Sequence, residues 1–226
     1  VPSKVIMPAV LEEIKQGNPG AKVTVLIATG FHRPTTREEL ISKFGEETVD
    51  HPDIRFVVHE SGKQEDMVSL GKLPSGGELL INKIAWEADL LISEGFIEPH
   101  FFAGFSGGRK SVLPGVSSRT TVLANHCSEF IDDPHARTGI LEGNPIHRDM
   151  IYAAGKAKLA FIINVVLDED KKVIEAFAGH YEKAHEKGCR FVDQLSGVDA
   201  VPSDIVISTN GGYPLDQNIY QSVKGM

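Results

Sequence analysis

Residues 22–40, KVTVLIATGFHRPTTREEL, contain the clearest structural signal in the chain. The first part, residues 22–28, is an almost continuous run of β-favouring apolar side chains, which is typical of a central parallel strand. Thr36 and Glu39 then have the spacing of a capping box, which predicts a helix over about residues 37–43. These residues therefore predict a strand that passes through a short loop into a helix.

Strand and helix signals alternate along the rest of the chain. Further strands are expected at residues 54–58, 78–82, 89–93, 159–167, 173–178 and 204–208, and further helices at residues 3–16, 84–88, 118–126, 145–158 and 179–195. Ser3 is expected to cap the first helix, and residues 173–178 are expected to form a hairpin with residues 159–167. This alternation predicts an α/β fold, with a layered, mainly parallel, Rossmann-like sheet flanked by helices in a single large domain.

The composition limits the class of protein. The chain has 226 residues and a formal net charge of −8, which argues against non-specific nucleic-acid binding because such binding depends on a surplus of Lys and Arg. No apolar run approaches the length of about 18 residues that indicates a membrane span. Cys127 and Cys189 are isolated and lack a metal-binding spacing, which fits a cytoplasmic protein in a reducing compartment.

Residues 95–126, GFIEPHFFAGFSGGRKSVLPGVSSRTTVLANH, contain most of the groups with unusual chemical surroundings. Glycines allow backbone N–H groups to approach a phosphate closely, so a glycine-rich turn before Lys110 is a candidate cofactor cradle. The residues of this candidate cradle are Gly104, Ser106, Gly107, Gly108 and Arg109. The same spacing also fits a tight turn followed by a solvated lysine, and the sequence alone leaves both interpretations open.

Two histidines follow expected strands. His32 lies in the loop after residues 22–28, and His100 follows the strand expected at residues 89–93. Ligands bind at the carboxyl ends of strands in open α/β sheets, so the two imidazoles are expected to face one crevice. An ordinary exposed loop histidine is the alternative for His32. The remaining histidines in polar or helical surroundings are expected at the surface: His51, His59, His180 and His185.

The chain resembles the nickel-pincer lactate racemase family. The resemblance is carried by ATGFHRP, by GFIEPHFFAGFSGGRKSVLPG, by the ANH that ends at His126, and by NGGYPLDQNIYQSVKGM at residues 210–226. It covers nearly the whole chain and implies an isomerase that racemises or epimerises a 2-hydroxy acid, by default lactate. It also implies that residues 1–226 are the family's N-terminal α/β domain, as a fragment without the extreme N-terminus or the C-terminal domain.

The resemblance further implies a cofactor and a set of site residues. The cofactor is a nickel pincer nucleotide, pyridinium-3-thioamide-5-thiocarboxylic acid mononucleotide, joined covalently to Lys110 and built by maturation enzymes. The matched positions are His126 for the nickel ligand, His32 and His100 for two acid/base groups, and Gln221 and Lys224 for the substrate carboxylate. Two bases suit this chemistry, because the enantiomers present their hydroxyl groups to opposite sides while the cofactor ring takes the hydride.

Two other functions remain open. His32, His100 and His126 would also suit a zinc hydrolase, since catalytic zinc often has three protein ligands. The chain would alternatively be a folded fragment without catalytic activity.

Overall fold

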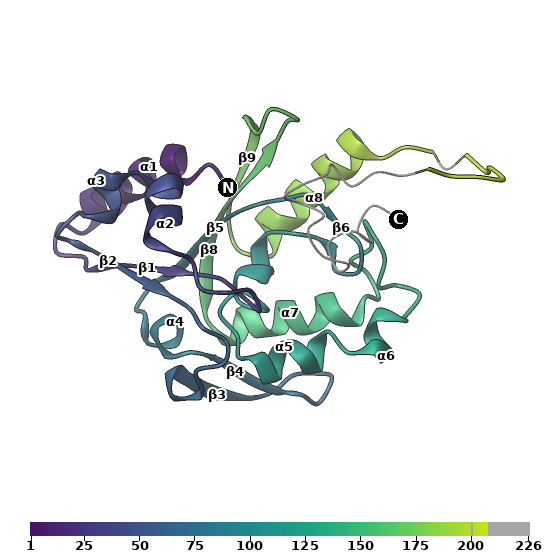
Figure 1. Ribbon diagram of the computed structural model, residues 1–226, viewed down its shortest axis with the longest axis horizontal. Helices are drawn as coiled ribbons and strands as arrows, with labels where there is room; N and C mark the ends of the chain where they lie inside the picture. Colours follow the sequence, from purple (N-terminus) through teal and green to yellow (C-terminus); the bar gives the residue numbers. More distant parts are fainter. Residues whose placement is uncertain (200, 208–226) are drawn as a thin grey trace. The chain divides into compact units, whose positions relative to one another are not determined.

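The computed structural model describes residues 1–199 and 201–207 (Figure 1). The chain divides into two compact units, Val1–Gln194 and Leu195–Met226, and the sheets and sites below lie in the first. The strand expected at residues 204–208 does not form over residues 204–207, and the rest of it lies outside the described residues. Gln221 and Lys224 also lie outside the described residues.

Parallel strand pairs form the centre of the fold. β1 (Val23–Ile27) pairs in parallel with β2 (Ile54–Val58). β5 (Leu91–Phe96) pairs in parallel with β8 (Leu159–Leu167), whose other edge pairs antiparallel with β9 (Val173–Gly179), as Figure 1 shows. The expected α/β class and the β8–β9 hairpin are therefore confirmed, and the described strands form both parallel and antiparallel pairs.

Two small antiparallel pairs complete the strands. β3 (Met67–Lys72) pairs with β4 (Glu78–Asn82), and β6 (Pro99–His100) pairs with β7 (Gly104–Phe105). Short 3-10 turns at Gln64–Asp66 and Gly108–Ser111 are labelled η1 and η2. The sequence did not predict β3, β6 or β7, because their short runs lack the alternating pattern that marks a strand.

Helices connect and cover the strands. They are α1 (Ser3–Gly17), α2 (Arg37–Phe44), α3 (Glu46–Val49), α4 (Lys83–Glu87), α5 (Arg119–Asn125), α6 (Ser128–Ile131), α7 (Pro145–Lys156) and α8 (Lys183–Ser196). The capping box of Thr36 and Glu39 is present. Ser3, however, is buried inside α1 instead of capping it, and its hydroxyl group donates a hydrogen bond to Glu94. Among the described residues, no helix has both the length and the apolarity that a membrane crossing requires.

The main hydrophobic cluster packs the segment after η2 against β4 and α7. Its fully buried members include Leu79 and Ile81 of β4, Leu113, and Ile146 and Met150 of α7. A second cluster, around Ile97, Phe105, Val166, Phe177 and Val192, packs β7 against the β8–β9 hairpin and α8. Both clusters hold the segment between β5 and α5 in place, and this segment carries most of the expected site residues.

Candidate functional site

The glycine turn before Lys110 is packed tightly against β8. Gly107 has φ +75°, and a Cβ there would lie 2.6 Å from Asn164 Oδ1 and 2.8 Å from Phe96 O. The Gly108 N–H donates to Asn164 Oδ1 at 2.6 Å, and the Ser106 N–H donates to Glu98 O at 2.9 Å. The turn therefore needs glycine because of its contacts within the protein, and these two N–H groups already have protein acceptors.

Arg109 is fully buried and holds this turn from inside. Its Nη1 donates to Phe105 O and its Nη2 to Ala103 O, each at 2.7 Å, and its Nε donates to His147 Nδ1 at 3.1 Å. Its Nη1 also lies 3.1 Å from His185 Nε2. Burial lowers the pKa of Arg109 to about 10, so the guanidinium stays charged at neutral pH. Its described hydrogen bonds are thus internal to the protein.

Two histidines expected at the surface are buried instead. His185 lies on the buried face of α8, where Nε2 is 2.8 Å from Ser106 O, and burial together with the Arg109 charge lowers its pKa well below the usual value. His59 Nε2 lies 3.0 Å from Ser117 O. The prediction was wrong because polar neighbours in sequence do not reveal hydrogen bonds to distant carbonyl groups. For His185 a signal existed: the buried residues of α8 recur at helical spacing, as His185, Gly188, Cys189 and Val192.

His126 lies at the carboxyl end of α5, where it interacts electrostatically with Lys110. Its Nδ1 is buried and has no hydrogen-bond partner in the described part of the chain. Burial, followed by the positive charge of Lys110, lowers the pKa of His126 to about 4. At neutral pH this imidazole is therefore uncharged, and it can donate a nitrogen lone pair to a metal ion.

His100 meets His126 across one aromatic side chain. The ring centroid of Phe102 lies 4.6 Å from that of His100 and 5.0 Å from that of His126, and both contacts are edge-to-face. The Ala103 N–H donates to His100 Nδ1 at 3.2 Å, which favours the tautomer with its proton on Nε2. The core packing of Phe102, which is 3% exposed, therefore positions both histidines.

His32 lies on an exposed loop that is joined to the same segment by backbone hydrogen bonds. The Gly30 N–H donates to Gly115 O at 2.9 Å, and the Gly115 N–H donates to Lys110 O at 3.0 Å. The His32 N–H itself donates to Thr29 O at 3.1 Å. These bonds place the loop of His32 beside the Lys110 segment, and the position of its ring in a shared crevice stays a prediction.

The three candidate histidines do not form a zinc site. Within residues 1–199 and 201–207, no group of three His, Cys, Asp or Glu side chains is arranged to hold a metal ion. A metal bound by His126 would therefore take its other ligands from outside the described side chains. This arrangement weighs against the zinc hydrolase interpretation.

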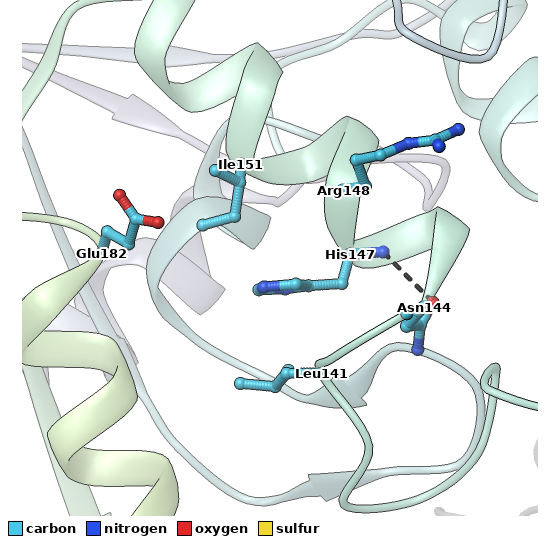
Figure 2. Close-up of a pocket in the computed structure, with 7 residues that line it drawn as sticks. Leu141, Asn144, His147, Arg148, Ile151 and Glu182 are labelled. Carbon is cyan, nitrogen blue, oxygen red and sulfur yellow. Dashed lines mark hydrogen bonds between the residues drawn. The ribbon is translucent and has the colours of Figure 1, made fainter.

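Of the two cavities described next, only the larger is lined by expected site residues. Figure 2 shows His147 projecting from α7 between Leu141 and Ile151 into a pocket of about 310 Å³, which no expected site residue lines. A larger cavity of about 1510 Å³ is lined by β1 and β5 and also by Ser106, Gly107 and Lys110. The larger cavity is therefore the one that meets the candidate cofactor loop.

Comparisons with known proteins show which proteins the chain is similar to. The family profile described as lactate racemase N-terminal domain matches residues 1–139, and the profile described as lactate racemase C-terminal domain matches residues 198–226. Lactate racemases from Thermoanaerobacterium thermosaccharolyticum and Lactiplantibacillus plantarum are 65% and 63% identical over 226 residues, which is 100% of this chain and 53% of each relative. The chain thus spans about half the length of these curated relatives.

Solved structures show the same fold. The structure of the lactate racemase apoprotein from Thermoanaerobacterium thermosaccharolyticum has a TM-score of 0.97 and 65% identity, covering 100% of this chain and 54% of that one. A crystal structure of a protein from Thermotoga maritima has a TM-score of 0.72 and 25% identity, covering 85% of this chain and 51% of that one. Our assignment of residues 1–226 to one N-terminal domain stays a prediction, and the match at residues 198–226 favours a boundary near residue 198.

Proposed function

Because this chain belongs to the lactate racemase family, we propose that it forms the catalytic α/β part of an isomerase that racemises a 2-hydroxy acid, with lactate as the expected substrate. One observation carries the proposal. The buried, uncharged imidazole of His126 lies near the Lys110 amine, and His100 packs on the same Phe102 ring. These contacts support a site that combines a metal-ligand candidate, an amine and a candidate proton-exchanging group.

The residues present fit the nickel pincer nucleotide that the family resemblance implies. The buried Nδ1 of His126 lacks a partner in the described chain, and neutral imidazole is a suitable nickel ligand. Lys110 lines the large cavity, so its amine can serve as the covalent attachment point, with Gly104, Ser106, Gly107, Gly108 and Arg109 fixing the loop that presents it. When bound, the cofactor supplies nickel and an electron-deficient ring that accepts a hydride.

His100 and His32 are proposed to exchange the substrate's hydroxyl proton on opposite sides. Since Ala103 N–H donates to Nδ1, His100 favours the tautomer that donates a proton from Nε2. To act as a base, His100 must accept the hydroxyl proton at Nε2, so its own proton must first move to Nδ1, which costs the Ala103 hydrogen bond, about 1 kcal/mol. The imidazolium formed in this way then returns a proton to the substrate oxygen. His32 lies on the exposed loop, so its tautomer is free to follow the substrate. Gln221 and Lys224 are proposed to hold the carboxylate, for which an amide and a cation are suitable donors.

The test uses the full-length parent protein, matured together with cofactor-building enzymes in the cytoplasm of the expression host. D- and L-2-hydroxy acids are supplied separately, and racemisation is measured for His32→Gln and His100→Gln. Each substitution is expected to lower kcat about 10²- to 10⁴-fold, because a positioned acid/base group contributes that much. Mass spectrometry should show the adduct on Lys110 unchanged in both variants. The control is His51→Gln, which replaces an exposed histidine and should keep full activity.

The same preparation separates the three candidate functions. Nickel together with an adduct on Lys110 supports the racemase. Zinc with an unmodified Lys110 and hydrolytic activity would favour the hydrolase. A matured parent that carries the adduct but racemises none of the acids would contradict the proposed substrate class, and near-full activity of either histidine variant would contradict the acid/base roles.

A further inference from the structure

His59 is a fully buried histidine for which the proposed chemistry has no role. It directly follows β2, at the carboxyl end of a parallel strand, and it is 0% exposed. Burying an imidazole costs free energy unless its ring nitrogens find hydrogen-bond partners. The partners of the His59 ring come from two separate segments of the chain, and its backbone contacts a third segment.

The hydrogen bonds of the His59 ring fix its protonation state. Nε2 lies 3.0 Å from Ser117 O, and a carbonyl oxygen can only accept, so Nε2 carries the proton. Nδ1 lies 3.2 Å from Asn82 Nδ2, and Asn82 Oδ1 already accepts the Ile84 N–H at 3.0 Å, so the amide of Asn82 donates to Nδ1. The ring is therefore neutral, in agreement with its burial, which lowers the pKa of His59.

The backbone of His59 holds the loop that carries His32. The Thr29 hydroxyl group donates to His59 O at 2.5 Å, and the His59 N–H donates to Ile27 O at 3.1 Å. Thr29 O in turn accepts the His32 N–H at 3.1 Å. Thr29 is buried whereas His32 is exposed, so the bond from the hydroxyl group anchors this loop at its buried end.

The ring of His59 holds the segment that follows Lys110. Ser117, whose carbonyl oxygen accepts from the ring, is fully buried between Gly115 and the start of α5. The Gly115 N–H donates to Lys110 O at 3.0 Å, and α5 leads on to its C-cap His126. The bond from the ring therefore anchors the chain between the candidate attachment lysine and the candidate nickel ligand.

We infer that His59 is a positioning residue for the proposed racemisation, because its backbone anchors the loop of His32 and its ring anchors the segment between Lys110 and His126. One buried residue, held by a fully satisfied polar network, thereby joins the two sides of the site. Proton transfer requires the two heavy atoms to lie about 3 Å apart, and a misplacement of about 1 Å can lower the rate about 10²-fold. The inference rests on the proposed function, since it takes His32 as an acid/base group.

Two pairs of variants of the matured full-length protein test this role. Thr29→Val keeps the shape of the side chain but removes the hydroxyl donor, whereas Thr29→Ser keeps the donor. His59→Leu removes both hydrogen bonds of the ring, whereas the amide of His59→Gln retains a donor for Ser117 O. The control is Val166→Ala, which destabilises the second hydrophobic cluster, where no residue of this network lies.

Racemisation of D- and L-lactate is measured per mole of Lys110 adduct, which mass spectrometry quantifies, so that a loss of folded or loaded protein does not count. Thr29→Val and His59→Leu are expected to lower kcat at least about tenfold, with KM changed by less than about twofold. Thr29→Ser, His59→Gln and the control should keep kcat within about threefold of the unsubstituted protein. A purely structural role predicts equal kcat per adduct in all five variants, and that result would overturn the inference.

Hydrogen exchange gives a second readout, which does not depend on activity. The Gly30 and His32 N–H groups are both hydrogen-bonded, so their exchange reports on the loop directly. Both should exchange at least about tenfold faster in Thr29→Val and His59→Leu than in the control variant. Unchanged exchange in Thr29→Val, whose side chain keeps its shape, would overturn the anchoring even if His59→Leu failed to fold.

The remaining outcomes separate this inference from the proposed function. Faster exchange in the loop with unchanged kcat per adduct would overturn the positioning role, because the anchoring would then not matter for the reaction. An unsubstituted protein that carries the adduct but racemises no 2-hydroxy acid would overturn the proposed function and this role together. An active unsubstituted protein with equally active Thr29→Val and His59→Leu variants would overturn this inference alone.

Discussion

The two sides of the candidate site are built in opposite ways. On one side, the segment that carries His100, Lys110 and His126 is held by buried groups, chiefly the Arg109 guanidinium and the Phe102 ring. On the other side, His32 lies on an exposed loop, next to the exposed ion pair of Arg33 and Glu39. The difference indicates that the proposed cofactor side is preorganised by the core, whereas the loop of His32 is positioned by local turn and cap interactions.

The largest expected effect comes from removing the buried guanidinium. Arg109→Met leaves the carbonyl groups of Ala103 and Phe105 without their charged donor, and we expect a loss of about 4 kcal/mol in the free energy of unfolding. Urea denaturation measures it. The control, Arg33→Met, removes only an exposed ion pair and should stay within about 1 kcal/mol. Equal losses of unfolding free energy in the two variants would show that the buried and the exposed arginine contribute alike, and the contrast between the two sides of the site would then be wrong.

A glycine pair separates backbone strain from close packing. Gly107 (φ +75°, ψ −175°) and Gly45 (φ +88°, ψ +148°) have similar strained backbones, but only at Gly107 would a Cβ meet neighbours, 2.6 Å from Asn164 Oδ1. We expect Gly107→Ala to cost about 3 kcal/mol and Gly45→Ala about 1–2 kcal/mol. Thermal unfolding of both variants tests this, and a smaller loss at Gly107 would show that the turn can relax.

The half-buried His147, beside Arg109, makes this side of the molecule sensitive to acid. Burial, together with the charge of Arg109, lowers the pKa of His147 from 6.5 to about 3. Since the folded state disfavours the charged ring, this contribution to stability is fully present above about pH 6.5 and is lost as the pH falls toward 3. Between pH 6.5 and 5 the loss is on the order of 2 kcal/mol.

His147→Gln isolates that contribution. Between pH 6.5 and 5, the free energy of unfolding should change less steeply with pH in this variant than in the unsubstituted chain. His51→Gln, which replaces a histidine at an exposed position, is the matched control. If His147→Gln left this pH dependence unchanged, the acid sensitivity would have to come from other groups, such as His185.

Local signals in the sequence predicted most of the elements. The capping box at Thr36, the Asn144 cap before Pro145 and the apolar run at Leu159–Leu167 each act within one turn or one strand, and all three are present. The Arg109 network was not predicted, because it joins groups 76 residues apart in sequence, such as Arg109 and His185. The sequence analysis placed the arginine in a candidate cofactor cradle, whereas its hydrogen bonds depend on which carbonyl groups the fold brings around it.

The smallest effect is expected on the side of His32. Thr36→Ala removes the side-chain acceptor of the Glu39 N–H, which should cost about 1 kcal/mol, as is usual for a helix cap. The loop of His32 begins at Gly30, whose N–H is hydrogen-bonded, and ends at this cap, so the variant should loosen the loop. We therefore expect kcat to fall in the matured full-length protein although the free energy of unfolding changes by only about 1 kcal/mol. Ser118→Ala removes the matching cap of α5 on the buried side, where core packing holds the segment. Equal losses of kcat in the two variants would show that both sides of the site depend on their caps, and the division between a rigid and an adaptable side would then be wrong.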